Sequence, residues 1–290
     1  MTCPWRGKRH GGAARAGLTA AALLVALPHG HALAADWVDH ALRGSFTSPA
    51  PVRWDGINFG VGVGVSNLNT DFGNGTSSLV AYMLRTTTIE NENRVSDWAT
   101  MPATTTSSKQ YSAFLGYNVQ MQDIVLGVDL GYVRPQKLDT AAADNITRTF
   151  TTSDDFSNTV TVSASSSLKL IDYAALRGRI GYAMGQFLPY VMFGGAVGRF
   201  DYTTQATVTA QGTDISNPPL GRPPYGPVTL SMAESKNGAI TGGFLFGLGA
   251  DVALTPNVFL RGEWEFVAFA PVHGIRSNLN TARVSLGMRF

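Results

Sequence analysis

Cysteine, charge and long apolar runs are all scarce in this sequence. One cysteine occurs among 290 residues, and charged residues make up only 14% of them. The longest apolar run, 16–27, falls short of the roughly 20 residues that a helix needs to cross a membrane, which argues against a helical anchor. Glycine, in contrast, occurs 32 times. This composition suits close-packed strands better than helices.

The first 35 residues have the pattern of a secretory signal peptide. A basic stretch precedes the apolar run, and Ala32-Leu33-Ala34 supplies small residues at a cleavage position. We therefore expect residues 1–35 to be a signal peptide, cut after Ala34 or Ala35, and the polar segment 36–52 to be a periplasmic leader. The only cysteine, Cys3, would leave with the signal. The mature chain would then have no disulfide, no cysteine–metal site and no cysteine nucleophile.

This cleavage gives a first prediction. Protein isolated from cell envelopes should have an intact mass that begins at residue 35 or 36, because the basic, apolar and small segments together form a processing signal. A measured mass that still contains Cys3 would contradict the assignment.

Net charge carries little functional information once the signal is removed. The full chain has a formal charge of +2, but residues 1–35 contain four basic residues and no acid. The rest of the chain has 18 basic and 20 acidic residues. It therefore has no basic surplus, and we expect no nucleic-acid partner.

Eight stretches alternate apolar residues with polar or small ones. A period of two is the strand period, with one apolar face and one wet face. A half-buried strand of a soluble sandwich would alternate in the same way. The assignment to a membrane barrel therefore depends on how many segments show the alternation. In 187–199 both faces are apolar or small, and which one points outward stays open. The eight predicted strands are 56–66, 111–121, 124–132, 170–182, 187–199, 242–254, 258–266 and 281–290.

The glycines of 56–66 form a GxGxG string, which could indicate a phosphate-binding loop. Such a loop requires the glycines to end a strand and open a helix. Here the alternation runs straight through them, from Ile57 to Val65. We interpret these glycines as leaving room inside a narrow barrel.

The connections between the predicted strands alternate in length. Short turns are expected at 122–123, 184–186 and 255–257, and long polar loops at 67–108, 134–167, 200–237 and 268–278, the third with four prolines near its middle. Outer-membrane barrels have short periplasmic turns and longer extracellular loops, and in lipid a sheet must close. The sequence thus predicts an all-β, eight-stranded antiparallel transmembrane β-barrel over 53–290. It would lie in the outer membrane with both termini periplasmic.

The last strand, 281–290, ends on an aromatic residue. Val284, Leu286, Met288 and Phe290 share its apolar face. This pattern resembles the signal by which bacterial outer-membrane barrels are recognised and inserted. We therefore expect the barrel assembly machinery and outer-membrane lipid as partners, while a surface ligand stays unknown.

Several short motifs resemble one family. They are Leu42-Arg43-Gly44-Ser45, Trp54-Asp55-Gly56, the segment 176–182, Leu188-Pro189-Tyr190 and Arg261-Gly262-Glu263-Trp264. They are similar to motifs of the small porin-like outer-membrane surface antigens of alphaproteobacteria. The resemblance covers the strands and fades in the loops. It implies an eight-stranded barrel that is abundant at the surface and important for envelope integrity. Some relatives are said to bind haemin, a property that no pattern in this sequence carries.

Charged residues recur on the inward faces of the predicted strands. An eight-stranded barrel is just wide enough for side chains to fill it, so charges inside must pair. Counted from the short turns, Arg179, Asp251 and Arg261 should share one level, and Arg177, Asp129 and Glu263 the next. We interpret the set as a salt-bridged plug, with a narrow ion path as the alternative. The inward residues are Asp129, Arg177, Arg179, Asp251, Arg261, Glu263 and Glu265.

Catalytic and cofactor chemistry finds little support. Glu263 and Glu265 could suggest acid–base catalysis, but their place beside arginines fits ion pairing better. His40 and His273 are the only histidines after residue 35. An axial haem ligand at His273 is the alternative to an ordinary exposed loop residue. We expect no cofactor, no metal site and no enzyme.

Two functions remain open. The first is a structural, surface-exposed barrel that contributes to envelope integrity and is at most weakly porin-like. The second is a binding or adhesion protein, for haemin or a host surface, whose loops carry the function, as loops on rigid scaffolds often do.

Overall fold

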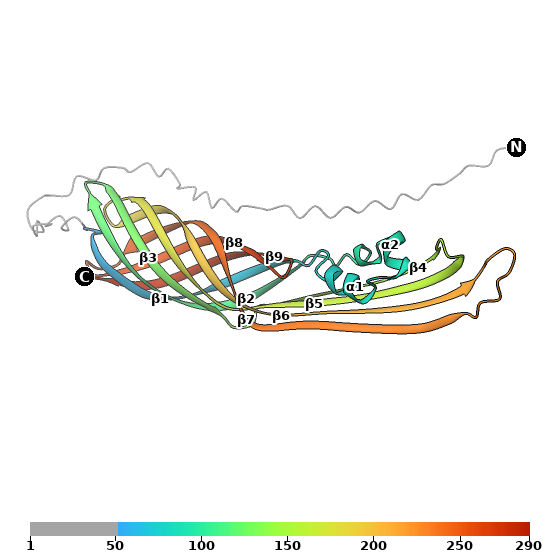
Figure 1. The fold of residues 1–290 in the computed structure, drawn as a ribbon. Coiled ribbons are helices and arrows are strands. Elements are labelled where there is room, and N and C mark those ends of the chain that lie inside the picture. Colours follow the sequence, from blue (N-terminus) through green and yellow to red (C-terminus); the bar gives the residue numbers. More distant parts are fainter. Residues whose placement is uncertain (1–51) are drawn as a thin grey trace, which may run out of the picture. The chain divides into compact units, whose positions relative to one another are not determined.

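The computed structural model describes residues 52–290, so the expected signal peptide and all but the last residue of the expected leader lie outside it. Nine antiparallel strands form one sheet (Figure 1). Its order is β3-β2-β1-β9-β8-β7-β6-β5-β4, and β3 also pairs with β5. Eight strands, all but β4, therefore form a closed ring, and the predicted eight-stranded barrel is confirmed. The strands are β1 (Gly56–Asp71), β2 (Thr104–Met121), β3 (Ile124–Pro135), β4 (Asp139–Thr151), β5 (Phe156–Tyr182), β6 (Phe187–Asp214), β7 (Tyr225–Ala253), β8 (Val258–Val272) and β9 (Ile275–Arg289).

The first and last strands close the ring. β1 pairs with β9 over nearly its whole length, from Asn58 opposite Arg289 to Asp71 opposite Arg276. Beside this seam, the rings of Phe59 and Phe290 stack 5.7 Å apart on the outer surface. Closure matters because a sheet with a free edge would leave unpaired backbone groups in hydrocarbon.

The outer surface of the barrel is apolar, as the period of two predicts. On β1, Ile57 to Val65 point outward at alternate positions, and beyond Val65 the outward residues become Asn67 and Asn69. On β6, Phe187, Val191, Phe193 and Val197 are exposed, whereas the even-numbered residues between them are buried or partly buried. The outward face of β6, which the sequence left open, is thus the odd-numbered one.

Three strands continue far beyond the apolar surface of the barrel. β5, β6 and β7 contain 27, 28 and 29 residues, whereas roughly 9–11 residues of a tilted strand cross a membrane. Together with β4 they form a four-stranded sheet that projects past the ring (Figure 1). We call this sheet the extension. It comprises residues 139–151, 156–170, 200–214 and 225–239. The opposite end, with the three short turns, is the turn end.

The predicted long loops are largely strand. Segments 134–167 and 200–237 were predicted as loops, but apart from turns and residues 215–224 they form the extension. Their polarity was misleading, because an exposed sheet is polar on its outer face without being a loop. The four prolines do lie in the loop 215–224, where extended sheet was not expected.

The other two predicted loops differ from expectation as well. Segment 268–278 is a hairpin turned by His273 and Gly274, whose φ angles of 49° and 78° suit a tight two-residue turn. Segment 67–108 contains α1 (Ser77–Met83), α2 (Thr88–Asn93) and a short 3-10 helix at Val95–Asp97. In the described part of the chain, no helix is long and apolar enough to cross a membrane.

The helices pack on one face of the extension. Leu79, Val80 and Leu84 from α1 and its end join Val160 and Val208 of β5 and β6 in one buried cluster. A register shift beside Ile171 allows this packing. Within the barrel the odd-numbered residues of β5 are buried, whereas within the extension the even-numbered residues of β5 are buried. The extension therefore has one covered face and one free face.

Candidate functional site

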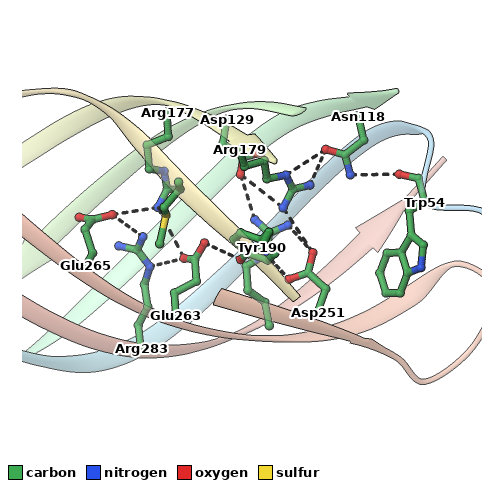
Figure 2. Close-up of polar contacts among 12 residues, drawn as sticks. Trp54, Asn118, Asp129, Arg177, Arg179, Tyr190, Asp251, Glu263, Glu265 and Arg283 are labelled. Carbon is green, nitrogen blue, oxygen red and sulfur yellow. Dashed lines mark hydrogen bonds and ion pairs between the residues drawn. The ribbon is translucent and has the colours of Figure 1, made fainter. Parts of the chain in front are cut away.

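The barrel interior contains two clusters of paired charges. The first, which we call the turn-side cluster, consists of Arg179, Arg261, Asp129 and Asp251. Arg261 donates two hydrogen bonds of 2.8 Å to Asp251, and Arg179 lies 3.3 Å from the same carboxylate. Asp129 lies 3.5 Å from Arg179 (Figure 2). It also lies 3.3 Å from Arg261. All four side chains are buried.

The second cluster, the mid-barrel cluster, repeats this arrangement. Arg283 donates to Glu263 at 2.5 Å and to Glu265 at 2.7 Å. Arg177 lies 3.1 Å from Glu265 and 3.5 Å from Glu263 (Figure 2). Each cluster has two arginines and two carboxylates, so each is formally neutral. That balance is what makes burying eight charges tolerable, because an unpaired buried charge is strongly destabilising.

Tyrosines and an asparagine supply the next hydrogen bonds. Tyr190 donates to Glu263 at 2.8 Å, and Tyr173 donates to Glu265 at 2.9 Å. Asn118 accepts from Arg179 at 2.5 Å and donates to the backbone carbonyl of Trp54 at 3.0 Å (Figure 2). The two glutamates are therefore held by hydroxyls as well as by arginines, a geometry that fixes their orientation.

Apolar layers lie on both sides of the charges. At the turn end, Trp54 is buried with Phe114, Leu188 and Phe259, and its indole donates to the carbonyl of Gly185 at 3.2 Å. Beyond the mid-barrel cluster, the apolar cluster that includes Tyr173, Leu245, Val267, Phe269 and Leu279 begins. The lumen is thus filled along its length by side chains, which is the packing expected for eight strands.

Glycines make room for the charged side chains. A Cβ at Gly116 would lie 1.7 Å from the Oδ1 atom of Asp129, and one at Gly127 would lie 2.7 Å from Nε of Arg179. In β1, a Cβ at Gly62 would lie 2.1 Å from the Ser285 hydroxyl. The space that glycine leaves is therefore occupied, as the sequence suggested for 56–66.

All seven charged residues selected from the sequence lie in the lumen. One level differs from expectation: Asp129 joins Arg179 and Arg261, not Arg177 and Glu263. Its backbone does lie opposite Arg177, but strand tilt staggers neighbouring side chains along the axis. Val284, Leu286, Met288 and Phe290, chosen as the insertion signal, all face outward.

Five residues of the site were missed: Asn118, Tyr173 and Tyr190, which bond to the charged side chains, and Arg283 and Trp54. Arg283 contacts both glutamates, and the period of two in 281–290 already placed it on the polar face. Trp54 closes the turn end. No periodicity marks Trp54, because it precedes the first strand, and only its burial identifies it.

His273 is not a freely exposed loop residue. Its ring stacks on Tyr202 with a centroid distance of 5.2 Å, and its Nε2 atom lies 3.5 Å from Glu234. This contact attaches the tip of the β8–β9 hairpin to the base of the extension. Within residues 52–290, no group of three or more metal-ligating side chains is present.

The tip of the extension is held by one carboxylate. The Arg222 guanidinium, 2.8 Å away, and the backbone amides of Ser216 and Arg222, each 3.0 Å away, donate to Asp214. These contacts hold the pKa of the Asp214 carboxyl well below its usual range. Because folding lowers this pKa, the stabilisation is fully present above the ordinary carboxyl pKa and is lost progressively as pH falls from there through the lowered value.

A second prediction follows for the loop 215–224. Its amide protection, corrected for intrinsic exchange, should persist from neutral pH to about pH 4, the ordinary range of an aspartate. In the Asp214→Asn variant the same amides should exchange faster at every pH, because the charged acceptor is gone. Hydrogen exchange read by mass spectrometry measures both. Wild-type protection that disappears near pH 4 would show that Asp214 does not hold the loop.

The fold and its filled lumen define a membrane-type β-barrel, and sequence comparison supports this class. The model of the outer membrane protein beta-barrel domain matches residues 40–290. The chain belongs to this family. No curated protein matches the sequence.

The comparison with solved structures matches, among others, the following three proteins. The attachment invasion locus protein Ail of Yersinia pestis is 10% identical with a TM-score of 0.29, over 81% of this chain and 99% of that one. Neisserial surface protein A is 12% identical with a TM-score of 0.29, over 80% and 97%. The outer membrane protease OmpT from Escherichia coli is 8% identical with a TM-score of 0.29, over 81% and 97%.

Proposed function

We propose that this protein is a structural outer-membrane barrel with a closed lumen, exposed at the cell surface, that contributes to envelope integrity. One observation carries the proposal: two neutral clusters of buried arginines and carboxylates fill the lumen between apolar layers. A conducting pore needs a continuous wet path. A salt-bridged plug instead makes the barrel rigid, and conductance is at most weak.

The proposed orientation places the turn end in the periplasm and the extension outside the cell. Short connections at one end and long segments at the other support it, because outer-membrane barrels have short periplasmic turns. Both termini are then periplasmic. The outward Val284, Leu286, Met288 and Phe290 on the closing strand would be available to the barrel assembly machinery. The short motifs further suggest a relation to the porin-like surface antigens of alphaproteobacteria.

Planar-bilayer recording of the purified barrel tests this proposal. We expect no discrete current steps, with a general porin as the positive control for insertion. In parallel, a strain lacking this protein should become sensitive to detergent, and a plasmid copy should restore resistance. Wild-type steps of porin size would refute the closed lumen. Unchanged detergent resistance would refute the structural role.

The extension favours a second function, binding at the cell surface. Its strands continue through residues 156–170 and 200–214 as ordered sheet, far more than a connection between barrel strands needs. Rigid platforms of this kind position binding groups better than free loops do. Loss of binding to a surface ligand without loss of detergent resistance would separate this role from the structural one.

A further inference from the structure

The free face of the extension has an unusual composition. Odd-numbered positions of its four strands, apart from Tyr225 at the start of β7, point away from the helices, and we call this surface the hydroxyl face. Between the row Asp139–Lys169–Asp201 at its base and the tip, it contains sixteen serines and threonines, three amides and three alanines. Its residues are Ala141, Ala143, Asn145, Thr147, Thr149, Thr151, Ser157, Thr159, Thr161, Ser163, Ser165, Ser167, Thr203, Gln205, Thr207, Thr209, Gln211, Thr213, Thr229, Ser231, Ala233 and Ser235.

Between the charged row at its base and the tip, this face has no charged residue, whereas the other face does. Asp144, Arg148, Glu234 and Lys236 lie on the same strand segments, and all are even-numbered. An ordinary exposed surface has roughly 25–35% charged residues, which would be about six of these positions. Solvation alone therefore does not explain the composition, because a solvated face tolerates charge well. An uncharged face on a sheet whose other face is charged indicates that this face binds an uncharged partner.

Part of the hydroxyl face bonds to itself. One row of threonines crosses all four strands, from Thr147 through Thr161 and Thr209 to Thr229. Within it, the hydroxyls of Thr147 and Thr161 lie 2.8 Å apart, and those of Thr209 and Thr229 lie 3.1 Å apart. Toward the tip the hydroxyls thus partner one another.

Nearer the base, the face is hollowed into a shallow trough. Two adjoining hollows of about 410 and 350 Å³ share Ala143, Ser165 and Gln205. Alanine and serine leave the space, and longer polar side chains such as Asn145 and Thr207 lie beside it. Among the described residues, the hydroxyls of Ser163, Ser165 and Ser167 and the amide of Gln205 have no side-chain hydrogen-bond partner, in contrast to the threonine row. Each hollow lies within the size range of small-ligand sites, roughly 300–1,000 Å³.

We propose that this trough binds a segment of an uncharged polysaccharide. Hydroxyls and amides both donate and accept hydrogen bonds, as sugar hydroxyls do. The trough has no arginine or lysine for a sulfated or phosphorylated chain, and no large aromatic or arginine anchor of the kind that protein interfaces use. The proposal rests on the binding role suggested above for the extension and names its ligand class.

Affinity electrophoresis through gels containing dextran, pullulan, a galactan or a mannan tests the proposal, with dextran sulfate as the charged contrast. The purified full-length protein should be retarded by at least one neutral polymer. Ser165→Phe fills the trough, lies outside the barrel on an exposed position, and should weaken retardation at least tenfold. Thr149→Phe, on the same face but outside the trough, is the matched control and should behave as wild type. Folding of each variant is verified by the different migration of unboiled and boiled samples.

Several results would overturn the proposal. Retardation by dextran sulfate alone would show that charged residues elsewhere bind the polymer. Equal effects of Ser165→Phe and Thr149→Phe would show that the trough is not the binding site. A dimer in analytical ultracentrifugation that Ser165→Phe abolishes, with no polysaccharide bound, would assign the face to a second copy. Altered ice-crystal growth without glycan binding would assign it to ordered water. Binding by purified protein but not by intact cells would support the trough and refute the proposed orientation instead.

Discussion

Replacing Arg283 by alanine is expected to lower the free energy of unfolding by about 3–5 kcal/mol, the typical cost of removing one partner from a buried ion pair. Arg283 contacts both Glu263 and Glu265. Without it, two buried carboxylates share Arg177 alone, and the cluster has an uncompensated negative charge. The measurement is urea unfolding of the barrel in detergent or vesicles.

A surface arginine provides the control. Arg94 forms an ion pair of 2.6 Å with Asp97, but its side chain is 80% exposed. Exposed pairs of this kind typically contribute about 0–1 kcal/mol. Arg94→Ala should therefore barely change the unfolding free energy, although its ion-pair distance is similar to those in the lumen. Burial, and not distance, decides the outcome.

Removing an arginine and its partner carboxylate together should destabilise the barrel by less than the sum of the two single changes. After Arg283→Ala and Glu263→Ala together, Arg177 and Glu265 remain as a neutral pair at 3.1 Å. The double variant should then be more stable than the sum of the two single effects predicts. The same reasoning applies to Arg177→Ala with Glu263→Ala, since these residues lie 3.5 Å apart. Additive and mild effects would mean that the charges do not form a plug, and would favour the narrow ion path.

The sequence predicted the barrel well because lipid imposes a strict pattern. Outward residues must be apolar, so a period of two marks the strands of the ring, with the exception of β6, whose two faces are both apolar or small. Tight turns such as Gln122-Asp123 could be located for the same reason, as the places where the alternation stops. The inward charges were evident because so few charged residues occur in this sequence.

The extension could not be predicted from the same signal. Outside the lipid, the free face of a strand is polar, and 156–170 therefore looked like a loop rich in serine and threonine. A weaker signal was present: Val160, Val162, Ala164, Leu168 and Leu170 already have a period close to two. The covering helices supply the apolar partner that makes these strands amphipathic, and no local pattern reveals that partner.

The pairing inside the lumen could be predicted only in part. Counting from the turns places residues along one strand, but strand tilt shifts neighbours along the axis, as with Asp129. Arg283 was on the polar face of the last strand but was not grouped with the charges. Trp54 lies before β1, and its burial depends on the whole barrel.

Substituting valine at Gly116 is expected to destabilise the barrel by about 4–8 kcal/mol, because the side chain needs the space that Asp129 occupies. The added Cβ would lie 1.7 Å from Oδ1 of Asp129 and 2.9 Å from the carbonyl oxygen of Val128. Overpacking typically costs about 1–3 kcal/mol, and here Asp129 cannot withdraw without leaving Arg179 and Arg261, which adds the cost of a broken buried ion pair.

Gly262→Val is the matched control, since Gly262 lies in β8, points outward, and has open space within 4 Å of the position that a Cβ would take. It should change stability by less than about 0.5 kcal/mol, as exposed substitutions usually do. Urea unfolding and the fraction of unboiled protein that migrates as folded barrel measure both variants. Equal behaviour of the two valines would show that the lumen near Asp129 is looser than its contacts imply, and the closed-lumen proposal would lose its main support.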